Sequence, residues 1–226
     1  AKLHVETETF LHEGGFPYAV GYGLTETAPM AAGQIPGKCR IGATGPAMAG
    51  VNIRLDNVNP ETGLGEIVIN SPSVMQGYYK NPEATADVFT EDGWFRTGDL
   101  GYIDEDGYIF IKGRLKNMIL GPSGENIYPV QIEDFLRAHP KIKDVAVIGL
   151  PDARLGEIAV AIVEIKENVT CTEEEINEFC KTLPRYKRPR KIIFAEVPRN
   201  PTGKIEKPVL REKYCQGRLV EAQITG

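Results

Sequence analysis

The sequence predicts a mixed α/β protein of the α+β kind, in which a small antiparallel sheet or barrel is followed by a small α/β domain. Up to about residue 112, short apolar runs are separated by turn signals. From residue 120 on, β-branched runs alternate with helical patterns. We therefore expect two domains, residues 1–112 and 120–226, joined by a hinge at residues 113–119.

Composition excludes several classes of protein. Of the 226 residues, 26 are basic and 31 are acidic, so the net charge of -5 gives no bias toward nucleic acid as a partner. The four cysteines lack Cys-x-x-Cys spacing, which favours reduced thiols and a cytoplasmic location. No apolar run approaches the ~20 residues that a membrane-spanning helix needs. The chain starts without methionine, and we expect it to be part of a longer protein.

Short strands are expected throughout the first part of the chain. Phe16–Val20 is an apolar and aromatic run that leads into a tight loop, and we expect it to form a strand. Residues 35–51 contain repeated glycines and are expected to be irregular. Asn-Pro-Glu-Thr-Gly and Asp-Glu-Asp-Gly turns then separate apolar runs. The antiparallel strands expected from them are residues 52–55, 66–70, 102–103 and 108–111.

A glycine-containing loop after Phe16–Val20 gathers several chemically useful groups. Gly21 and Gly23 flank an aromatic ring, and hydroxyl and carboxylate groups follow. Tyr22 could stack on a base, and the Thr25 hydroxyl could hold phosphate oxygens. Glu26 could ligate Mg²⁺, a cation that prefers oxygen. From these residues alone, a polar surface turn with a buried tyrosine is the favoured interpretation.

A second candidate group is Asp99, which follows Thr-Gly near the only tryptophan, Trp94. An ionised aspartate accepts hydrogen bonds through both oxygens and could bind the two hydroxyls of a ribose. The simpler alternative is that Asp99 caps a turn, and for an isolated aspartate we favour it.

The last third of the chain predicts a separate α/β domain. Pro129 suits the first turn of a helix that runs to about Ala138. Thr172 and Glu175 have the spacing of a capping box before another helix, and a final helix is expected to start near Lys207. The expected strands are residues 145–150, 158–165 and 191–197. Together these elements predict a three-stranded sheet with about three helices.

Two basic features lie in this domain. Five cations fall between residues 185 and 191, where they could meet nucleic acid or the phosphates of a ligand, although a solvated charged edge is the commoner outcome. In residues 198–205, two prolines and a glycine fix a loop that would project Lys204. A lysine held in this way suits a developing negative charge, and the alternative is an ordinary exposed lysine.

Five motifs in a fixed order resemble the adenylate-forming superfamily, most closely its acyl-CoA synthetases. They are GYGLTET at residues 21–27, RTGD at 96–99, GRLKNMI at 113–119, SGENIYP at 123–129 and NPTGKI at 200–205. The resemblance covers essentially the whole chain. It implies that residues 1–112 belong to the large AMP-binding domain, with its β subdomain, and that residues 120–226 form the C-terminal lid.

The resemblance also implies the chemistry. ATP and a carboxylic acid, here expected to be a medium or long fatty acid, would give an acyl-adenylate, and coenzyme A would then take the acyl group. Tyr22 would stack on adenine, Thr25 would contact phosphate, Glu26 would hold Mg²⁺ and Asp99 would bind the ribose. The residues implied to bind the nucleotide are Gly21, Tyr22, Gly23, Thr25, Asp99 and Arg114.

Two lysines receive roles from the same resemblance. Lys116 stands at the hinge position, and Lys204 would bridge the acid and the nucleotide during adenylation, with Thr25 and Glu26 as further catalytic residues. The loop at residues 121–128 and the Gly156–Glu157 region would face inward for thioester formation. The family's phosphate loop would precede Gly21 and is not present, so we expect this chain alone to be inactive.

Two alternatives remain. An amino-acid-activating adenylation domain of a peptide synthetase would carry similar motifs and would be followed by a carrier domain. A binding or interaction module could keep the fold without turnover, although intact Glu26, Asp99, Arg114 and Lys204 argue against that. We make no prediction of the oligomeric state.

Overall fold

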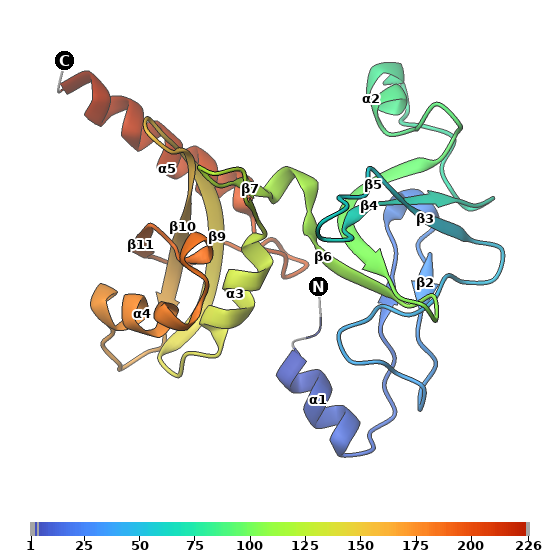
Figure 1. Cartoon of the computed structure of the whole chain (residues 1–226), viewed down its shortest axis with the longest axis horizontal. Coiled ribbons are helices and arrows are strands. Elements are labelled where there is room, and N and C mark those ends of the chain that lie inside the picture. The colour runs from blue at the N-terminus through green and yellow to red at the C-terminus, as the bar shows by residue number, and fades with distance from the viewer. Residues whose placement is uncertain (1–2, 4, 225–226) are drawn as a thin grey trace. The chain divides into compact units, whose positions relative to one another are not determined.

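The computed structural model describes residues 3 and 5–224, with side chains described as far as residue 215 (Figure 1). It is a mixed α/β structure with several small sheets, as the sequence predicts. The chain divides into two compact units, of which the first ends at Lys116 and the second begins at Asn117. This boundary lies within η2 (Leu115–Asn117), in the segment expected to be a hinge. Rotation at the segment stays a prediction.

The first unit is built on a four-stranded antiparallel sheet. In spatial order its strands are β3 (Asn52–Asp56), β4 (Gly65–Asn70), β5 (Phe95–Ile103) and β6 (Ile109–Arg114). The turn signals predict all four strands, but β5 begins at Phe95, whereas the sequence analysis expected a strand only at residues 102–103. In the β5–β6 turn, the Asp104 carboxylate accepts from the Tyr108 N–H at 2.8 Å. Ile67, Ile69 and Ile109 form the core on one face of the sheet.

The start of the first unit differs from the expectation. Phe16–Val20 is not a strand: Phe16 is 63% exposed, and strand pairing begins only at β1 (Gly21–Tyr22), which pairs with β2 (Ala32–Gly33). The apolar run was misleading because apolar residues form a strand only where a partner strand is available. Three further elements of the first unit were not expected from the sequence: α1 (Val5–Glu13), α2 (Pro82–Asp87) and the short 3₁₀ helix η1 (Thr25–Thr27).

The second unit confirms the predicted three-stranded sheet. β9 (Ile142–Asp152) and β11 (Lys191–Phe194) flank β10 (Gly156–Ile165), antiparallel and parallel to it respectively. The helices are α3 (Pro129–Arg137), α4 (Glu173–Phe179) and α5 (Lys207–Ile224). The short elements are β7 (Ile119–Leu120), β8 (Asn126–Ile127), η3 (Cys180–Thr182) and η4 (Arg185–Lys187).

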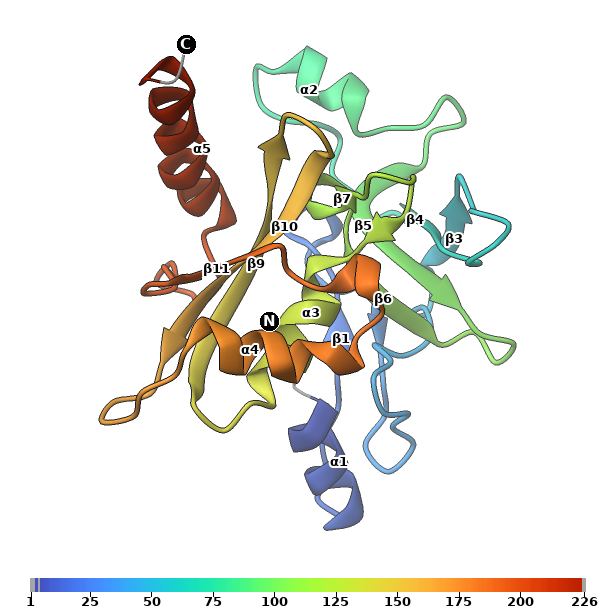
Figure 2. The same cartoon turned by 60° about the vertical axis from the view of Figure 1, so that its left-hand side comes forward.

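Both faces of this sheet are covered, as Figure 2 shows. Ile132 and Leu136 of α3 and Ile176 of α4 pack on one face, and Leu210 of α5 packs on the other. The predicted capping box starts α4, because the Thr172 hydroxyl accepts from the Glu175 N–H and the Glu175 carboxylate accepts from the Thr172 N–H. Burial on both faces explains why β9 and β10 read as continuous apolar runs.

The glycines near the expected hinge differ in backbone conformation. Neither Gly113 nor Gly121 has a positive φ. Residues 121–125 form the turn of the β7–β8 hairpin, and Gly124 is its left-handed residue, with φ of 88°.

Among the described residues, no helix is both long and apolar enough to cross a membrane.

Candidate functional site

The candidate site in the first unit centres on the carboxylate of Asp99. The Tyr22 hydroxyl donates to Asp99 Oδ2 at 2.7 Å, and Arg114 Nε lies 2.7 Å from Oδ1. Asp99 and Arg114 are directly opposite each other on β5 and β6, where opposite charges stabilise a strand pair. Asp99 therefore does not cap a turn, and that interpretation is wrong. It lies within β5, beside a bulge at which Gly98 has φ of 69°.

Burial and charge act against each other in this cluster. Asp99 is 5% exposed, and its pKa is raised by burial, which the hydrogen bond from Tyr22 and the charge of Arg114 only partly offset. Burial, and then the charge of Asp99, raise the pKa of Tyr22. Because two donors face the Asp99 oxygens, the cluster favours a carboxylate acceptor beside a protonated tyrosine.

Backbone contacts fix the position of Asp99. The Thr97 hydroxyl donates to the Ile67 carbonyl oxygen at 2.7 Å and accepts from the Asp99 N–H at 3.1 Å. The buried Glu66 carboxylate accepts from the Gly98 N–H at 3.1 Å and from Arg96 at 2.8 Å. The sequence analysis gave Thr97 no role, although it lies in the RTGD motif, and it missed Glu66, because only the pairing of β4 with β5 brings Glu66 to the site.

The ring of Tyr22 belongs to the core of the first unit. It is 8% exposed and packs with Ile67, Ile69 and Ile109, so the buried tyrosine of the simpler interpretation is confirmed. Stacking on a base would use the little ring surface left free and stays a prediction. Glycine is required at Gly23, because a Cβ atom there would lie 1.6 Å from the Pro29 carbonyl oxygen.

Thr25 and Glu26 lie on η1, close to Tyr22 in sequence. Thr25 is exposed, and the Tyr78 hydroxyl donates to Glu26 Oε1 at 3.0 Å. Tyr78 was not identified from the sequence. Within the described part of the chain, no three His, Cys, Asp or Glu side chains are grouped for a metal. A lone Glu26 carboxylate fits Mg²⁺ where nucleotide phosphates complete the ligand set, since Mg²⁺ is often held by one or two carboxylates and substrate phosphates.

Lys204 and Lys207 both belong to the second unit. Lys204 is exposed on the loop that precedes α5, as its prolines and glycine predict. Lys207, the first residue of α5, has a side chain that is only 12% exposed: its Nζ lies 2.6 Å from Oε1 of Glu133, which also accepts from the Val147 N–H at 2.7 Å. Burial lowers the pKa of Lys207, and Glu133 opposes this effect. Sequence reasoning did not find this ion pair.

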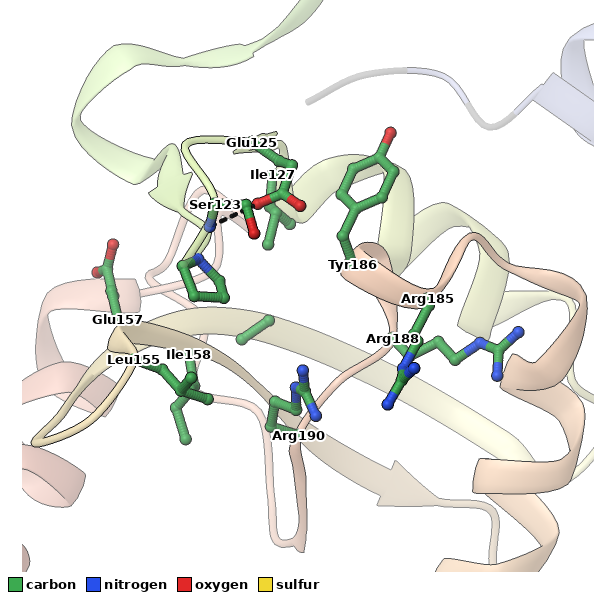
Figure 3. Close-up of a pocket in the computed structure, with 12 residues that line it drawn as sticks. Ser123, Glu125, Ile127, Leu155, Glu157, Ile158, Arg185, Tyr186, Arg188 and Arg190 are labelled. Carbon is green, nitrogen blue, oxygen red and sulfur yellow. Dashed lines mark hydrogen bonds between the residues drawn. The ribbon is translucent and has the colours of Figure 1, made fainter.

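A pocket of about 270 Å³ lies entirely within the second unit (Figure 3). Three arginines from η4 and the segment after it, Arg185, Arg188 and Arg190, gather on one side, and Glu157 lies at the opposite end. Arg188 donates to the carbonyl oxygens of Leu183 and Lys181. The side chains of Arg185 and Arg190 make no hydrogen bond or ion pair with any described residue, and only their backbones are hydrogen-bonded. Part of the predicted basic patch therefore lines a cavity.

Two family models match the chain. Residues 1–79 match the model for AMP-binding enzymes, and residues 131–204 match that for the AMP-binding enzyme C-terminal domain. The chain belongs to the AMP-binding enzyme family. The segments matched contain Tyr22, Thr25 and Glu26 at one end and Lys204 at the other.

Named relatives of this AMP-binding enzyme chain act on different acids. The long-chain-fatty-acid–CoA ligase FadD13 of Mycobacterium tuberculosis is 55% identical over 161 residues, which are 70% of this chain and 31% of the relative. A structure of the ATP-bound RpMatB-BxBclM chimera B3 has a TM-score of 0.85 and 38% identity, and the match covers 96% of this chain and 44% of the chimera.

A third AMP-binding relative is o-succinylbenzoate CoA synthetase from Bacillus subtilis, in complex with its acyl-adenylate intermediate. Its TM-score is 0.84 at 29% identity, and the match covers 93% of this chain and 44% of the synthetase. The chain therefore spans less than half the length of these relatives. Their names support ATP-dependent ligation of an acid to coenzyme A as the general reaction of such relatives.

Proposed function

We propose that this chain is part of an ATP-dependent carboxylate–CoA ligase that acts through an acyl-adenylate. The single observation that carries the proposal is the Asp99 carboxylate, buried and oriented by Tyr22 and Arg114. A buried carboxylate held by two donors is an acceptor pre-arranged for paired hydroxyls, since each oxygen keeps a further lone pair. Family membership and the acyl-adenylate complex of the Bacillus subtilis relative support the same reaction.

The proposed residue roles follow the positions of the side chains. Asp99 accepts from the ribose hydroxyls, Arg114 reaches the nucleotide, and the exposed Thr25 hydroxyl contacts phosphate. Gly21 and Gly23 let the backbone pass close to the nucleotide. The exposed part of the Tyr22 ring stacks on adenine. Mg²⁺ bound by Glu26 and nucleotide phosphates would neutralise phosphate charge.

The proposed reaction has two steps, adenylation of the acid and then thioester formation. A carboxylate oxygen of the acid attacks the α-phosphorus of ATP, and the bond to the departing pyrophosphate breaks. The thiol of coenzyme A then loses its proton, its sulfur attacks the acyl carbon, and AMP departs. Lys204 supplies positive charge in the first step, where two anions approach each other. We propose that the segment at residues 113–119 is the hinge that lets the second unit serve both steps.

We propose a medium or long fatty acid as the substrate, supported by the name of the Mycobacterium tuberculosis relative. The test is acid-dependent exchange of labelled pyrophosphate into ATP by a full-length protein that contains this chain. Straight-chain acids of increasing length are expected to support exchange best at medium or long chain length. Exchange driven only by amino acids would favour the peptide-synthetase alternative, and no exchange with any acid would favour a non-catalytic module.

The arginine pocket is proposed to bind the phosphates of coenzyme A. Arg185 and Arg190 offer guanidinium groups that bind phosphate through two parallel hydrogen bonds. Replacing both by alanine in the full-length protein is expected to raise KM for coenzyme A about 10-fold or more, since each charge-assisted hydrogen bond contributes about 1.5–3 kcal/mol. Steady-state thioester formation measures KM, and pyrophosphate exchange should stay unchanged.

Pantetheine and Arg154 provide the controls for this prediction. Pantetheine has the thiol but lacks the phosphates, so its use as an acceptor should be equal in the double variant and the parent. Arg154 is exposed and does not line the pocket, so Arg154→Ala should leave KM for coenzyme A unchanged. An equal loss with pantetheine would contradict phosphate binding by Arg185 and Arg190.

A further inference from the structure

The loop that carries Lys204 is held by its own backbone and by Asn200. The Asn200 N–H donates to the Lys204 carbonyl oxygen at 2.9 Å, and the Lys204 N–H donates to Asn200 Oδ1 at 2.9 Å. Asn200 Oδ1 also accepts from the Thr202 N–H at 3.1 Å. Gly203 has φ of 79°, which turns the chain back toward α5. The backbone of Lys204 is therefore fixed although its side chain is exposed.

Arg199 ties this loop to the sheet. Its Nε and Nη2 atoms each lie 2.7 Å from Oδ2 of Asp144, near the start of β9, and its Nη1 donates to the Gly203 carbonyl oxygen. The Gly203 carbonyl belongs to the peptide unit whose nitrogen is that of Lys204. One guanidinium group thus joins the sheet to the peptide bond next to the lysine.

Asp144 is itself held in place, so it can serve as a fixed anchor. Its side chain is 13% exposed, and its Oδ1 accepts from the Val145 N–H at 2.8 Å. Arg137 of α3 lies 3.6 Å from the same oxygen. The contacts that run from α3 through Asp144 to Arg199 are all internal to the second unit. They do not depend on how the two units are arranged.

We propose that Arg199 is a positioning residue for Lys204. Arg199 bonds to Asp144 and to the Gly203 carbonyl oxygen at the same time. It thereby fixes the direction in which the Lys204 side chain points away from the second unit. Each of its three guanidinium nitrogens already has a partner within the second unit, so the role we assign to it is to orient the loop. This inference rests on the proposed role of Lys204 in adenylation.

The test separates the two half-reactions in a full-length protein that contains this chain. Arg199→Met is expected to lower kcat for pyrophosphate exchange about 10-fold, because a displaced catalytic group loses its alignment with the reacting atoms. KM for ATP and for the acid should not change, and thioester formation from supplied acyl-adenylate should keep its rate. Asp144→Asn should show the same pattern. In a Lys204→Ala background, Arg199→Met should cause no further loss.

Lys141→Met is the matched control, because Lys141 forms an ion pair with Glu175 in the same unit, far in sequence from the Lys204 loop. It should leave both half-reactions unchanged. Equal losses in the two half-reactions of Arg199→Met, or a loss that adds to that of Lys204→Ala, would overturn the proposal.

Hydrogen–deuterium exchange on the full-length protein that contains this chain tests the contacts of Arg199 independently of activity. Arg199→Met should speed exchange in residues 198–206 and leave β9 and β10 protected, and unchanged exchange in that loop would overturn the inference. If the unaltered full-length protein showed no acid-dependent pyrophosphate exchange, the proposed function would fail. The hydrogen–deuterium exchange result would still decide whether Arg199 orders the loop.

Discussion

Replacing Lys204 by alanine in a full-length protein that contains this chain is expected to slow acyl-adenylate formation by roughly 10²-fold or more. Adenylation brings a carboxylate to the α-phosphate of ATP, so two anions must approach each other. A cation about 4 Å away contributes on the order of 4 kcal/mol at an effective dielectric of about 20. Pyrophosphate exchange measures this step. Thioester formation from supplied acyl-adenylate should survive, because the attack is then on the acyl carbon and not on the phosphorus.

An exposed lysine elsewhere in the same unit provides the control for this prediction. Lys181 forms an ion pair with Glu178 at the end of α4, and Lys181→Ala should leave both half-reactions intact. An equal loss of adenylation and thioester formation in Lys204→Ala would refute the assigned role of Lys204.

Replacing Glu133 by alanine is expected to destabilise the second unit by about 3–5 kcal/mol, because it leaves the buried Lys207 ammonium without its partner. Glu133 is 2% exposed, and its carboxylate accepts from both Lys207 and the Val147 N–H. The free energy of unfolding, measured with urea on the 226-residue chain, should fall by this amount at neutral pH.

The pH dependence identifies the cause of that loss. Burial lowers the pKa of Lys207, and Glu133 raises it, so the pKa of Lys207 should fall further in Glu133→Ala. The unfolded state then binds more protons than the folded state between the lowered pKa and the ordinary value of 10.5, and stability rises with pH in that window. The deficit should therefore shrink as pH rises.

An apolar pair is the matched control for Glu133→Ala. Glu133→Leu combined with Lys207→Met removes both charges and leaves a volume of similar size, so it should recover most of the lost stability. Both variants leave the Val147 N–H without its acceptor, so a double variant as unstable as Glu133→Ala would mean that lost packing or this lost hydrogen bond, and not an unpaired charge, causes the effect.

Local signals in the sequence predict much of the fold. The Asp-Gly turn before Tyr108 predicts the β5–β6 hairpin, and the Thr172–Glu175 capping box predicts the start of α4. Both succeed because a turn or a cap is decided by residues a few positions apart. The false strand at Phe16–Val20 and the unexpected α1 show the limit of such signals, since pairing partners and burial decide those segments.

The candidate site is harder to predict, because its contacts join distant parts of the chain. Motif resemblance singled out Tyr22, Asp99 and Arg114, but the bond from Tyr22 to Asp99 spans 77 residues and depends on the fold. The supporting groups were missed for the same reason. The Lys207–Glu133 pair and the Arg199–Asp144 pair each connect a loop or helix start to a distant element. No local spacing of residues predicts such pairs.

A single-turnover chase tests the central claim most directly. A full-length protein that contains this chain is mixed with ATP and a labelled fatty acid without coenzyme A, and the bound products are separated before and after coenzyme A is added. The account predicts that acyl-adenylate and pyrophosphate form first, and that coenzyme A then converts the adenylate to thioester and AMP. Thioester formed with ADP and inorganic phosphate, or no acyl-adenylate before coenzyme A is added, would contradict it.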